Sequence, residues 1–301
     1  MMEQTLLLRS FMFLPAYNKK FIDKALASEA DALILDMEDS VPSLNRQEAR
    51  ENIIACHKSG MLDKRDIFIR INEIGSRDFA EDVTQLCLHG IRGFVPPKIK
   101  TAEDIVFLDK LLEVMELKNG IEPGTIKLAP LIETASAVAN INAIAFASKR
   151  LVALCFGGED YLNDLDVVYA YQESAFILPR SVIVNAARAA GLLPIDTPYL
   201  KIADVEGFEM KCREAYRNGF GGCLILNPKQ IQPANRAFSP DPEKVEYSRK
   251  IIEASRLADA EKQSGVAMLE GTMIGPPMKK CAQKVLEQDE LINSVSVKKK
   301  G

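Results

Sequence analysis

The chain has 301 residues, of which 47% are hydrophobic and 27% are charged, and its formal net charge is -4. This acidic balance argues against nucleic acid or an anionic membrane surface as the main partner, and no apolar run approaches the roughly 20 residues of a membrane-spanning helix. The first residues lack the basic-then-apolar order of a signal peptide. The six cysteines have neither CxxC nor metal-ligand spacing. We therefore expect a cytoplasmic protein with reduced thiols.

Short apolar runs alternate with segments of helical spacing along the first 230 residues. The apolar runs predict strands at 10–16, 32–37, 66–72, 93–96, 127–132, 151–156, 193–195 and 223–226. Helices are predicted at 19–28, 43–58, 76–88, 102–117, 135–147, 173–190 and 205–218, with an insertion at 161–171. Strands that are apolar on both faces and alternate with helices indicate a parallel sheet covered by helices. Eight such units favour closure into a (β/α)8 TIM barrel, and the rival GxGxxG pattern after the first strand is absent.

The last sixty residues have a different texture. A charged helix is predicted at 243–262, a hairpin or extended arm at 267–274, and a further helix at 278–287, with Pro276 and Pro277 breaking the arm. We therefore divide the chain into a barrel at 1–240 and a C-terminal helix and arm at 241–301. A segment this small cannot bury a large core. We expect it to pack on the barrel or on a neighbouring subunit, and hence a homo-oligomer.

Polar side chains follow the predicted strands at the end where barrels place their chemistry. They are Asp36, Glu38, Asp39, Arg70, Asn72, Lys98, Glu133, Glu159 and Asp160. So many charges at one barrel mouth are costly unless a cation and an anionic ligand join them. Mg²⁺ prefers hard oxygen ligands and takes few of them from protein, whereas zinc is disfavoured because no His or Cys accompanies the acids. Arg70 suits a bidentate grip on a carboxylate or a developing enolate oxygen.

Each of these residues also has a structural interpretation. Asp36 lies inside a strand and could anchor backbone groups or pair with a base. Glu133 could be a charge favoured by the dipole at the start of a helix. Asp160 could cap the helix of the insertion. The occurrence of such residues at successive strand ends favours a functional site.

Several stretches together resemble the citrate lyase β-subunit-like (CitE-like) family of the HpcH/HpaI aldolase superfamily, alongside malyl-CoA and citramalyl-CoA lyases. The stretches are residues 8–16, 33–41, 69–72, 97–98, 132–134, 157–160 and 220–240. The resemblance covers nearly the whole chain. It implies a TIM barrel, a homotrimer or hexamer, Mg²⁺, and reversible carbon–carbon cleavage of a 3-hydroxy-3-carboxyacyl thioester. Citramalyl-CoA, malyl-CoA and a citryl thioester are such substrates, and the carrier is CoA or an acyl carrier protein.

The resemblance also implies roles for individual residues. Glu133 and Asp160 match the family's metal ligands, Glu133 also lying against the substrate, and Arg70 matches its substrate arginine. Glu38 and Asp39 match acids at the rim of the site. Backbone amides around Gly158 and Glu159 match those that meet the substrate carboxylate. Lys19, at the end of the first strand, is a candidate for the CoA phosphates.

Two departures from the family pattern bear on the activity. The sugar-acid aldolase branch has a catalytic His where this chain has Asp39, so a pyruvate-dependent aldolase is the lesser alternative. In the CoA lyases an arm aspartate acts as general acid/base, and here that position is Gly275. Because a positioned acid or base contributes about 10²–10⁴-fold, a second alternative is a protein that binds metal and a CoA ester or keto acid without cleaving it.

Overall fold

A computed structural model of the chain describes residues 6–167, 172–260 and 266–298. Parts of the predicted insertion at 161–171 and of the C-terminal segment therefore lie outside the described residues. The chain divides into two compact units, one formed by residues 8–236 and the other by residues 1–7 with 237–301.

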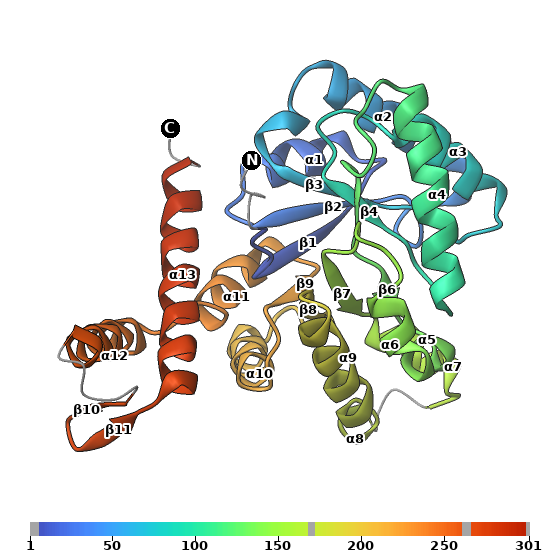
Figure 1. Ribbon diagram of the computed structural model, residues 1–301. Coiled ribbons are helices and arrows are strands. Elements are labelled where there is room, and N and C mark those ends of the chain that lie inside the picture. Colours follow the sequence, from blue (N-terminus) through green and yellow to red (C-terminus); the bar gives the residue numbers. More distant parts are fainter. Residues whose placement is uncertain (1–5, 168–171, 261–265, 299–301) are drawn as a thin grey trace. The chain divides into compact units, whose positions relative to one another are not determined.

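The first unit contains a parallel sheet surrounded by helices (Figure 1). Its strands are β1 Ser10–Pro15, β2 Ala32–Asp36, β3 Asp66–Arg70, β4 Gly93–Val95, β5 Lys127–Leu128, β6 Leu131–Ile132, β7 Ala153–Phe156, β8 Leu193–Asp196 and β9 Gly222–Ile225. Its helices are α1 Lys19–Leu26, α2 Arg46–Lys58, α3 Arg77–Leu86, α4 Ala102–Lys118, α5 Ala135–Ala139, α6 Ile141–Ala145, α7 Gly158–Asp164, α8 Gln172–Ala175, α9 Ile177–Ala189, α10 Val205–Arg217 and α11 Ile231–Ala237. Short 3-10 turns occur at Ser43–Asn45, Leu62–Lys64 and Pro228–Gln230.

The sheet closes on itself through the segment 127–132. Its strand order is β5-β4-β3-β2-β1-β9-β8-β7-β6, so β5 and β6 stand at opposite ends of the order although only Ala129 and Pro130 separate them in the chain. This segment bonds on both sides: the Ala129 N–H donates to the Phe94 carbonyl at 2.9 Å, and the Gly157 N–H donates to the Ile132 carbonyl at 3.1 Å. β5 and β6 are thus two halves of one barrel strand, interrupted at a proline that has no N–H to give. The predicted (β/α)8 barrel is confirmed.

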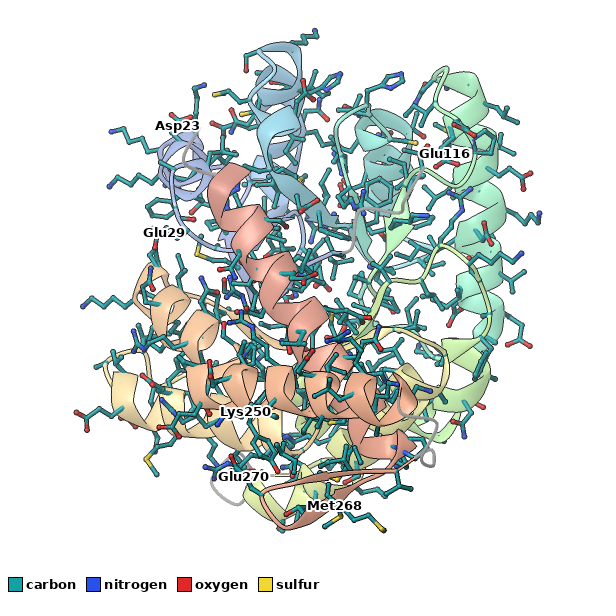
Figure 2. All side chains as sticks on the ribbon, turned by 60° about the vertical axis from the view of Figure 1, so that its left-hand side comes forward. Asp23, Glu29, Glu116, Lys250, Met268 and Glu270 are labelled. Atoms are coloured by element: carbon teal, nitrogen blue, oxygen red, sulfur yellow. The ribbon has the colours of Figure 1, made fainter. Side chains whose placement is uncertain are left out.

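Buried ion pairs fix the amino-terminal end of the barrel, away from the strand ends that carry the candidate site. The guanidinium of Arg150 contacts Glu116 at 2.7 Å and Asp109 at 2.5 Å. Glu116, labelled on α4 in Figure 2, also accepts the N–H of Ile126 at 2.7 Å and so holds the chain entering β5. These charges are satisfied within the protein, and their role is structural.

The second unit contains α12 Pro242–Ala260, the hairpin of β10 Ala267–Leu269 and β11 Thr272–Ile274, and α13 Pro276–Lys298. The hairpin turns at Glu270 and Gly271, which both have positive φ, 49° and 80°, as a two-residue hairpin loop of this kind requires. A small apolar cluster of Ile251, Ala267, Ile274 and Ala282 holds helices and hairpin together. An ion pair of Lys250 with Glu270 at 3.5 Å adds to it (Figure 2).

Several local predictions differ from the structure. Pro276 and Pro277 do end the hairpin, but they also begin α13, because the first turn of a helix does not need their missing N–H groups. That helix continues to Lys298, well beyond the predicted end at 287. The predicted helices at 135–147 and 173–190 are each two shorter helices. Five cysteines are buried, and Cys281 is exposed. Among the described residues no helix has the length and apolar character to cross a membrane.

Candidate active site

A cavity of about 430 Å³ lies at the carboxyl ends of the barrel strands. Its lining comes from the ends of β1, β2, β3, β6 and β9 and from the segments that follow β2, β6, β7, β8 and β9. The lining residues are Phe13, Leu14, Pro15, Asp36, Asp39, Ser40, Arg70, Leu131, Glu133, Gly157, Gly158, Glu159, Asp160, Pro198, Leu200, Leu224 and Leu226. Six of the acidic and basic residues predicted from the strand ends, Asp36, Asp39, Arg70, Glu133, Glu159 and Asp160, therefore line one cavity.

Arg70 and Asp36 form a buried, two-bonded ion pair on one side of the cavity. The parallel register places Asp36 directly opposite Arg70 on the neighbouring strand. Both Asp36 oxygens accept from the guanidinium, each at 2.6 Å, and they also accept the backbone N–H groups of Glu38 and Ser40 at 3.0 Å. Burial opposes ionisation of Asp36, but these bonds hold its pKa below the ordinary value. The structural interpretation of Asp36, as a partner for a base and for backbone groups, describes what is seen.

The remaining nitrogen of the guanidinium faces the two acids that follow β2. Arg70 Nη1 lies 3.0 Å from Glu38 Oε2 and 3.0 Å from Asp39 Oδ2. Glu38 is buried, whereas the side chain of Asp39 is 59% exposed. Asp39 is therefore the partner of Arg70 that an incoming carboxylate can displace most easily, because its own charge is readily solvated.

Lys98 continues this network from the end of β4. Its ammonium donates to Glu38 Oε1 at 2.9 Å. Burial raises the pKa of Glu38, although Arg70 and Lys98 both act against that shift. On this side of the cavity three acids thus meet two basic side chains of the protein.

Glu133 and Asp160 form the other side of the cavity and have no such partners. Within the described part of the chain neither carboxylate makes an ion pair with a Lys, Arg or His side chain. Glu133 is only 2% exposed. Burial, and next the charge of Asp160, raise the pKa of Glu133 to about 8. Burial and the charge of Asp39 likewise raise the pKa of Asp160.

The backbone around Glu133 fixes the position of its carboxylate. The N–H of Lys98 donates to Glu133 Oε1 at 2.7 Å, and Lys98 adopts a left-handed backbone with φ of 52° that non-glycine residues seldom take. From β7, Gly157 packs against the same side chain: a Cβ at this position would lie 2.5 Å from Glu133 Oε2. Only glycine leaves room for the carboxylate here.

The Glu133 and Asp160 pair fits Mg²⁺ better than a metal that needs a full protein ligand set. Among the described residues no group of three or more His, Cys, Asp or Glu side chains is arranged to hold a metal ion. Mg²⁺ is bound through one or two carboxylates, its other positions being filled by water and substrate oxygens. Two acids whose pKa values are raised by burial and by neighbouring carboxylates are stabilised by a divalent cation between them.

The other predicted residues are less directly placed. The Gly158 N–H, expected to meet a substrate carboxylate, donates to Thr197 Oγ1 at 2.9 Å, so it already has an internal partner. Glu159 lines the cavity. Lys19 is exposed in the first turn of α1 and does not line the cavity.

Sequence reasoning missed the residues that follow β8. Pro198 and Leu200 line the cavity, and Thr197 lies beside it through its bond with Gly158. The predicted strand ended at 195, whereas β8 ends at Asp196. The search for polar residues at strand ends was not applied to this strand. Asp196 and Thr197 are polar, so the same search would have pointed to this segment.

Comparisons with known proteins place this site among characterised relatives. The family model described as HpcH/HpaI aldolase/citrate lyase matches residues 9–228. The citrate lyase subunit beta of Haemophilus influenzae is 31% identical over 281 residues, covering 93% of this chain and 96% of that protein. The L-malyl-CoA/beta-methylmalyl-CoA lyase of Cereibacter sphaeroides is 28% identical over 306 residues, covering 95% and 96%. The structure of the CitE protein of Mycobacterium tuberculosis in complex with magnesium, acetoacetate and coenzyme A superposes with a TM-score of 0.74 at 27% identity, covering 95% and 99%.

Proposed function

The chain belongs to the HpcH/HpaI aldolase/citrate lyase family, and from this premise we propose that it is an Mg²⁺-dependent carbon–carbon lyase acting on a 3-hydroxy-3-carboxyacyl thioester. Citramalyl-CoA, malyl-CoA and a citryl thioester are examples of such a substrate. The observation that carries the proposal is the pair Glu133 and Asp160, which has no protein cation within the described residues and faces the same cavity as Arg70. A metal ion would complete the charge on the Glu133 side, and a substrate carboxylate would take the place of Asp39 at Arg70.

In this proposal the acidic and basic residues of the site have different roles. Glu133 and Asp160 would hold Mg²⁺, which supplies Lewis-acid polarisation of substrate oxygens when bound. Arg70 would bind the substrate, with Asp39 giving way to it. Cleavage breaks the bond between the hydroxyl-bearing carbon and the α-carbon of the thioester, and the electron pair passes to a thioester enolate. The guanidinium of Arg70, held rigidly by Asp36, is suited to stabilise that developing charge.

Two proton transfers accompany the cleavage, and we assign them to Glu38 and Asp39, the two acids that contact Arg70 Nη1. The substrate hydroxyl loses a proton, and the enolate carbon gains one. The side chain of Asp39 lines the cavity and is 59% exposed. Glu38 is buried between Arg70 and Lys98 with a raised pKa. A base and an acid in different environments are what the two transfers require.

Substitution of the proposed metal ligands tests this function. Glu133→Gln and Asp160→Asn should each weaken Mg²⁺ binding, measured by titration calorimetry, by more than the roughly 10–100-fold that loss of an outer-sphere partner costs. Thioester cleavage should fall in parallel. Glu73→Gln is the matched control, because Glu73 is an exposed acid that follows β3 at the same end of the barrel and does not line the cavity. Full Mg²⁺ affinity and turnover in both ligand variants would refute the proposed site.

Gly275 supports a second candidate, a protein that binds metal and a CoA ester or keto acid without cleaving it. The family's arm aspartate corresponds to this position, and Gly275 has no ionisable group. It lies at the start of α13, where its carbonyl accepts the N–H groups of Met278 and Lys279, and an added Cβ would approach nothing closer than Pro277 Cδ at 3.7 Å. The position therefore accepts an aspartate, a residue that is also favoured just before a helix.

Gly275→Asp distinguishes the two candidates by acyl-CoA cleavage assays with Mg²⁺. If the wild type cleaves robustly, Glu38 and Asp39 suffice and the binding-only candidate is wrong. If the wild type is nearly inactive and Gly275→Asp raises the rate by about 10²-fold or more, the missing arm acid is the cause. Gly275→Asn, which offers a similar cap without an ionisable group, is the control and should leave the rate unchanged.

We further propose that the hairpin packs on a second copy of the chain. Met268 and Met273 are paired across β10 and β11, and each is 65% exposed. An exposed pair of large apolar side chains on a two-stranded hairpin is typical of an interaction surface. Sedimentation of the wild type and of the double variant Met268→Ser, Met273→Ser tests it, with a trimer or hexamer expected for the wild type and dissociation for the variant.

A further inference from the structure

A second, larger cavity adjoins the one that holds the candidate active site. Its volume is about 730 Å³, and it is lined by residues of α9 and α10, by Asp196 at the end of β8 and by the segment that follows it. Glu159, Pro198 and Leu200 line both cavities. The two spaces therefore share one boundary, formed mainly by the segment after β8.

Four charged side chains in the wall of the second cavity, Arg180, Asp196, Lys211 and Glu214, are paired with each other. The guanidinium of Arg180 lies 2.8 Å from Asp196 Oδ2 and 3.0 Å from Glu214 Oε1, and Lys211 lies 3.7 Å from the other oxygen of Glu214. A phosphate or carboxylate would have to compete with these acids for Arg180 and Lys211. The remaining cation of the described lining, Lys201, is an exposed side chain, so that lining offers an anion no buried cation that is free of an acid.

Apolar and aromatic side chains form much of the remaining wall. Phe176 packs edge-on against Phe156, with ring centroids 5.3 Å apart, and Ile177, Pro198 and Leu200 extend the apolar surface toward the shared boundary. A cavity of this size and character takes an uncharged chain with occasional polar groups. The 430 Å³ cavity, with its acids and Arg70, takes the charged end of a substrate.

We propose that the second cavity receives the uncharged chain of the thioester substrate, which passes over Leu200 while the carboxylate end stays with Arg70. This inference rests on the proposed function and adds a binding site for the rest of the substrate. Two parts of a thioester have this chemistry: a long acyl substituent and the amide-containing arm of the carrier. The experiment separates them.

The chain contains no tryptophan, so a single introduced indole reports on its own surroundings. Ile177→Trp places the indole in the wall of the second cavity, and Leu178→Trp places it one residue later on the same helix, outside both cavities. The two native side chains are 68% and 64% exposed, so neither substitution disturbs packed core, and circular dichroism checks the fold. The probes are acetyl-CoA and hexanoyl-CoA, and the same two acyl groups on N-acetylcysteamine, each titrated with Mg²⁺ present.

We expect the emission of the Ile177→Trp variant to shift to shorter wavelength and saturate, or the variant to lose affinity at least tenfold because the indole fills the cavity. The Leu178→Trp variant should show neither effect. A response that grows with acyl length on both carriers assigns the cavity to the acyl substituent. A response to both CoA esters, and to neither N-acetylcysteamine ester, assigns it to the carrier arm.

Calorimetry on the wild type separates failure of this inference from failure of the proposed function. If acyl-CoA binds but the two variants behave alike, the chain of the substrate lies elsewhere and the inference is wrong while the lyase proposal stands. If no thioester binds the wild type, the proposed function fails and this inference fails with it.

Discussion

The two sides of the catalytic cavity are both acidic, but only one of them is neutralised by the protein. At the ends of β2, β3 and β4, three acids, Asp36, Glu38 and Asp39, meet Arg70 and Lys98 at distances of 2.6–3.0 Å. After β6 and β7, Glu133 and Asp160 meet no basic side chain within ion-pair distance in the described residues. One side is complete as folded, and the other is complete only with an added cation.

This difference shows how one barrel mouth can hold both a fixed positive charge, the guanidinium of Arg70, and an exchangeable one, a bound metal ion. Arg70 is held rigidly because its buried partners, Asp36 and Glu38, cannot move away without leaving a buried charge unpaired. The Glu133 side is free to take an ion because the protein supplies none. The comparison predicts that removing an acid destabilises the first side and relieves the second.

Asp36→Asn should have the largest effect on stability. It leaves the buried guanidinium of Arg70 without its two-bonded partner, and breaking a buried pair in this way costs about 3 kcal/mol or more. Urea unfolding of the metal-free protein measures the loss. Asp39→Asn is the control, because the side chain of Asp39 is 59% exposed and such an ion pair contributes less than about 1 kcal/mol. Equal losses from the two variants would contradict the rigid and displaceable roles assigned to them.

Glu133→Gln should stabilise the folded protein, whereas Asp36→Asn destabilises it. The change in unfolding free energy caused by Glu133→Gln should depend on pH. The pKa of Glu133 is about 8 in the folded protein and ordinarily 4.5. Between these values the unfolded chain has lost a proton that the folded chain keeps. The stability associated with protonated Glu133 is therefore full below pH 4.5 and is lost as the pH rises to about 8, at about 1 kcal/mol per pH unit.

Subtracting the unfolding free energy of Glu133→Gln from that of the wild type, from pH 5 to 9 in EDTA, isolates this contribution. With rising pH the unfolding free energy of the wild type should fall relative to that of Glu133→Gln. Saturating Mg²⁺ should abolish or reverse this trend because the ion stabilises the carboxylate. Glu122→Gln, at an exposed acid outside the cavity, should give a flat difference. A flat difference for Glu133→Gln as well would place that carboxylate in a neutralised environment and remove the contrast between the two sides.

The sequence predicted the barrel and the clustering of its strand-end residues because both follow from periodicity. Runs of apolar residues show where buried strands begin and end, and parallel strands bring their C-terminal residues to one rim. The split of one barrel strand into β5 and β6 also has a visible cause, Pro130. The double role of Pro276 and Pro277 was missed because a proline that ends one element suits the first turn of the next.

The partnerships among the site residues could not be predicted in the same way. Arg70 was expected to bind substrate, and the sequence does not reveal that Asp36 occupies two of its donors, because that depends on the register between β2 and β3. The left-handed backbone of Lys98 could not be predicted from the sequence, because lysine rarely adopts this conformation. The second cavity depends on the spacing of α9 and α10, which local sequence does not determine.

Lys98 touches both sides of the cavity, and its variants should show the smallest effects. Lys98→Met removes the 2.9 Å bond to Glu38, which costs about 1 kcal/mol, and keeps the strained backbone. Lys98→Gly removes the same bond and more packing, but it relieves a left-handed conformation that costs a non-glycine residue about 1 kcal/mol. The glycine variant should therefore unfold at a urea concentration no lower than that of the methionine variant.

Both Lys98 variants keep the backbone N–H that donates to Glu133 at 2.7 Å, so calorimetry should give them equal Mg²⁺ affinity. A glycine variant less stable than the methionine variant by about 1 kcal/mol would contradict the strain assigned to this backbone. A loss of Mg²⁺ affinity shared by both variants would show that the ammonium of Lys98 and not its backbone links the two sides.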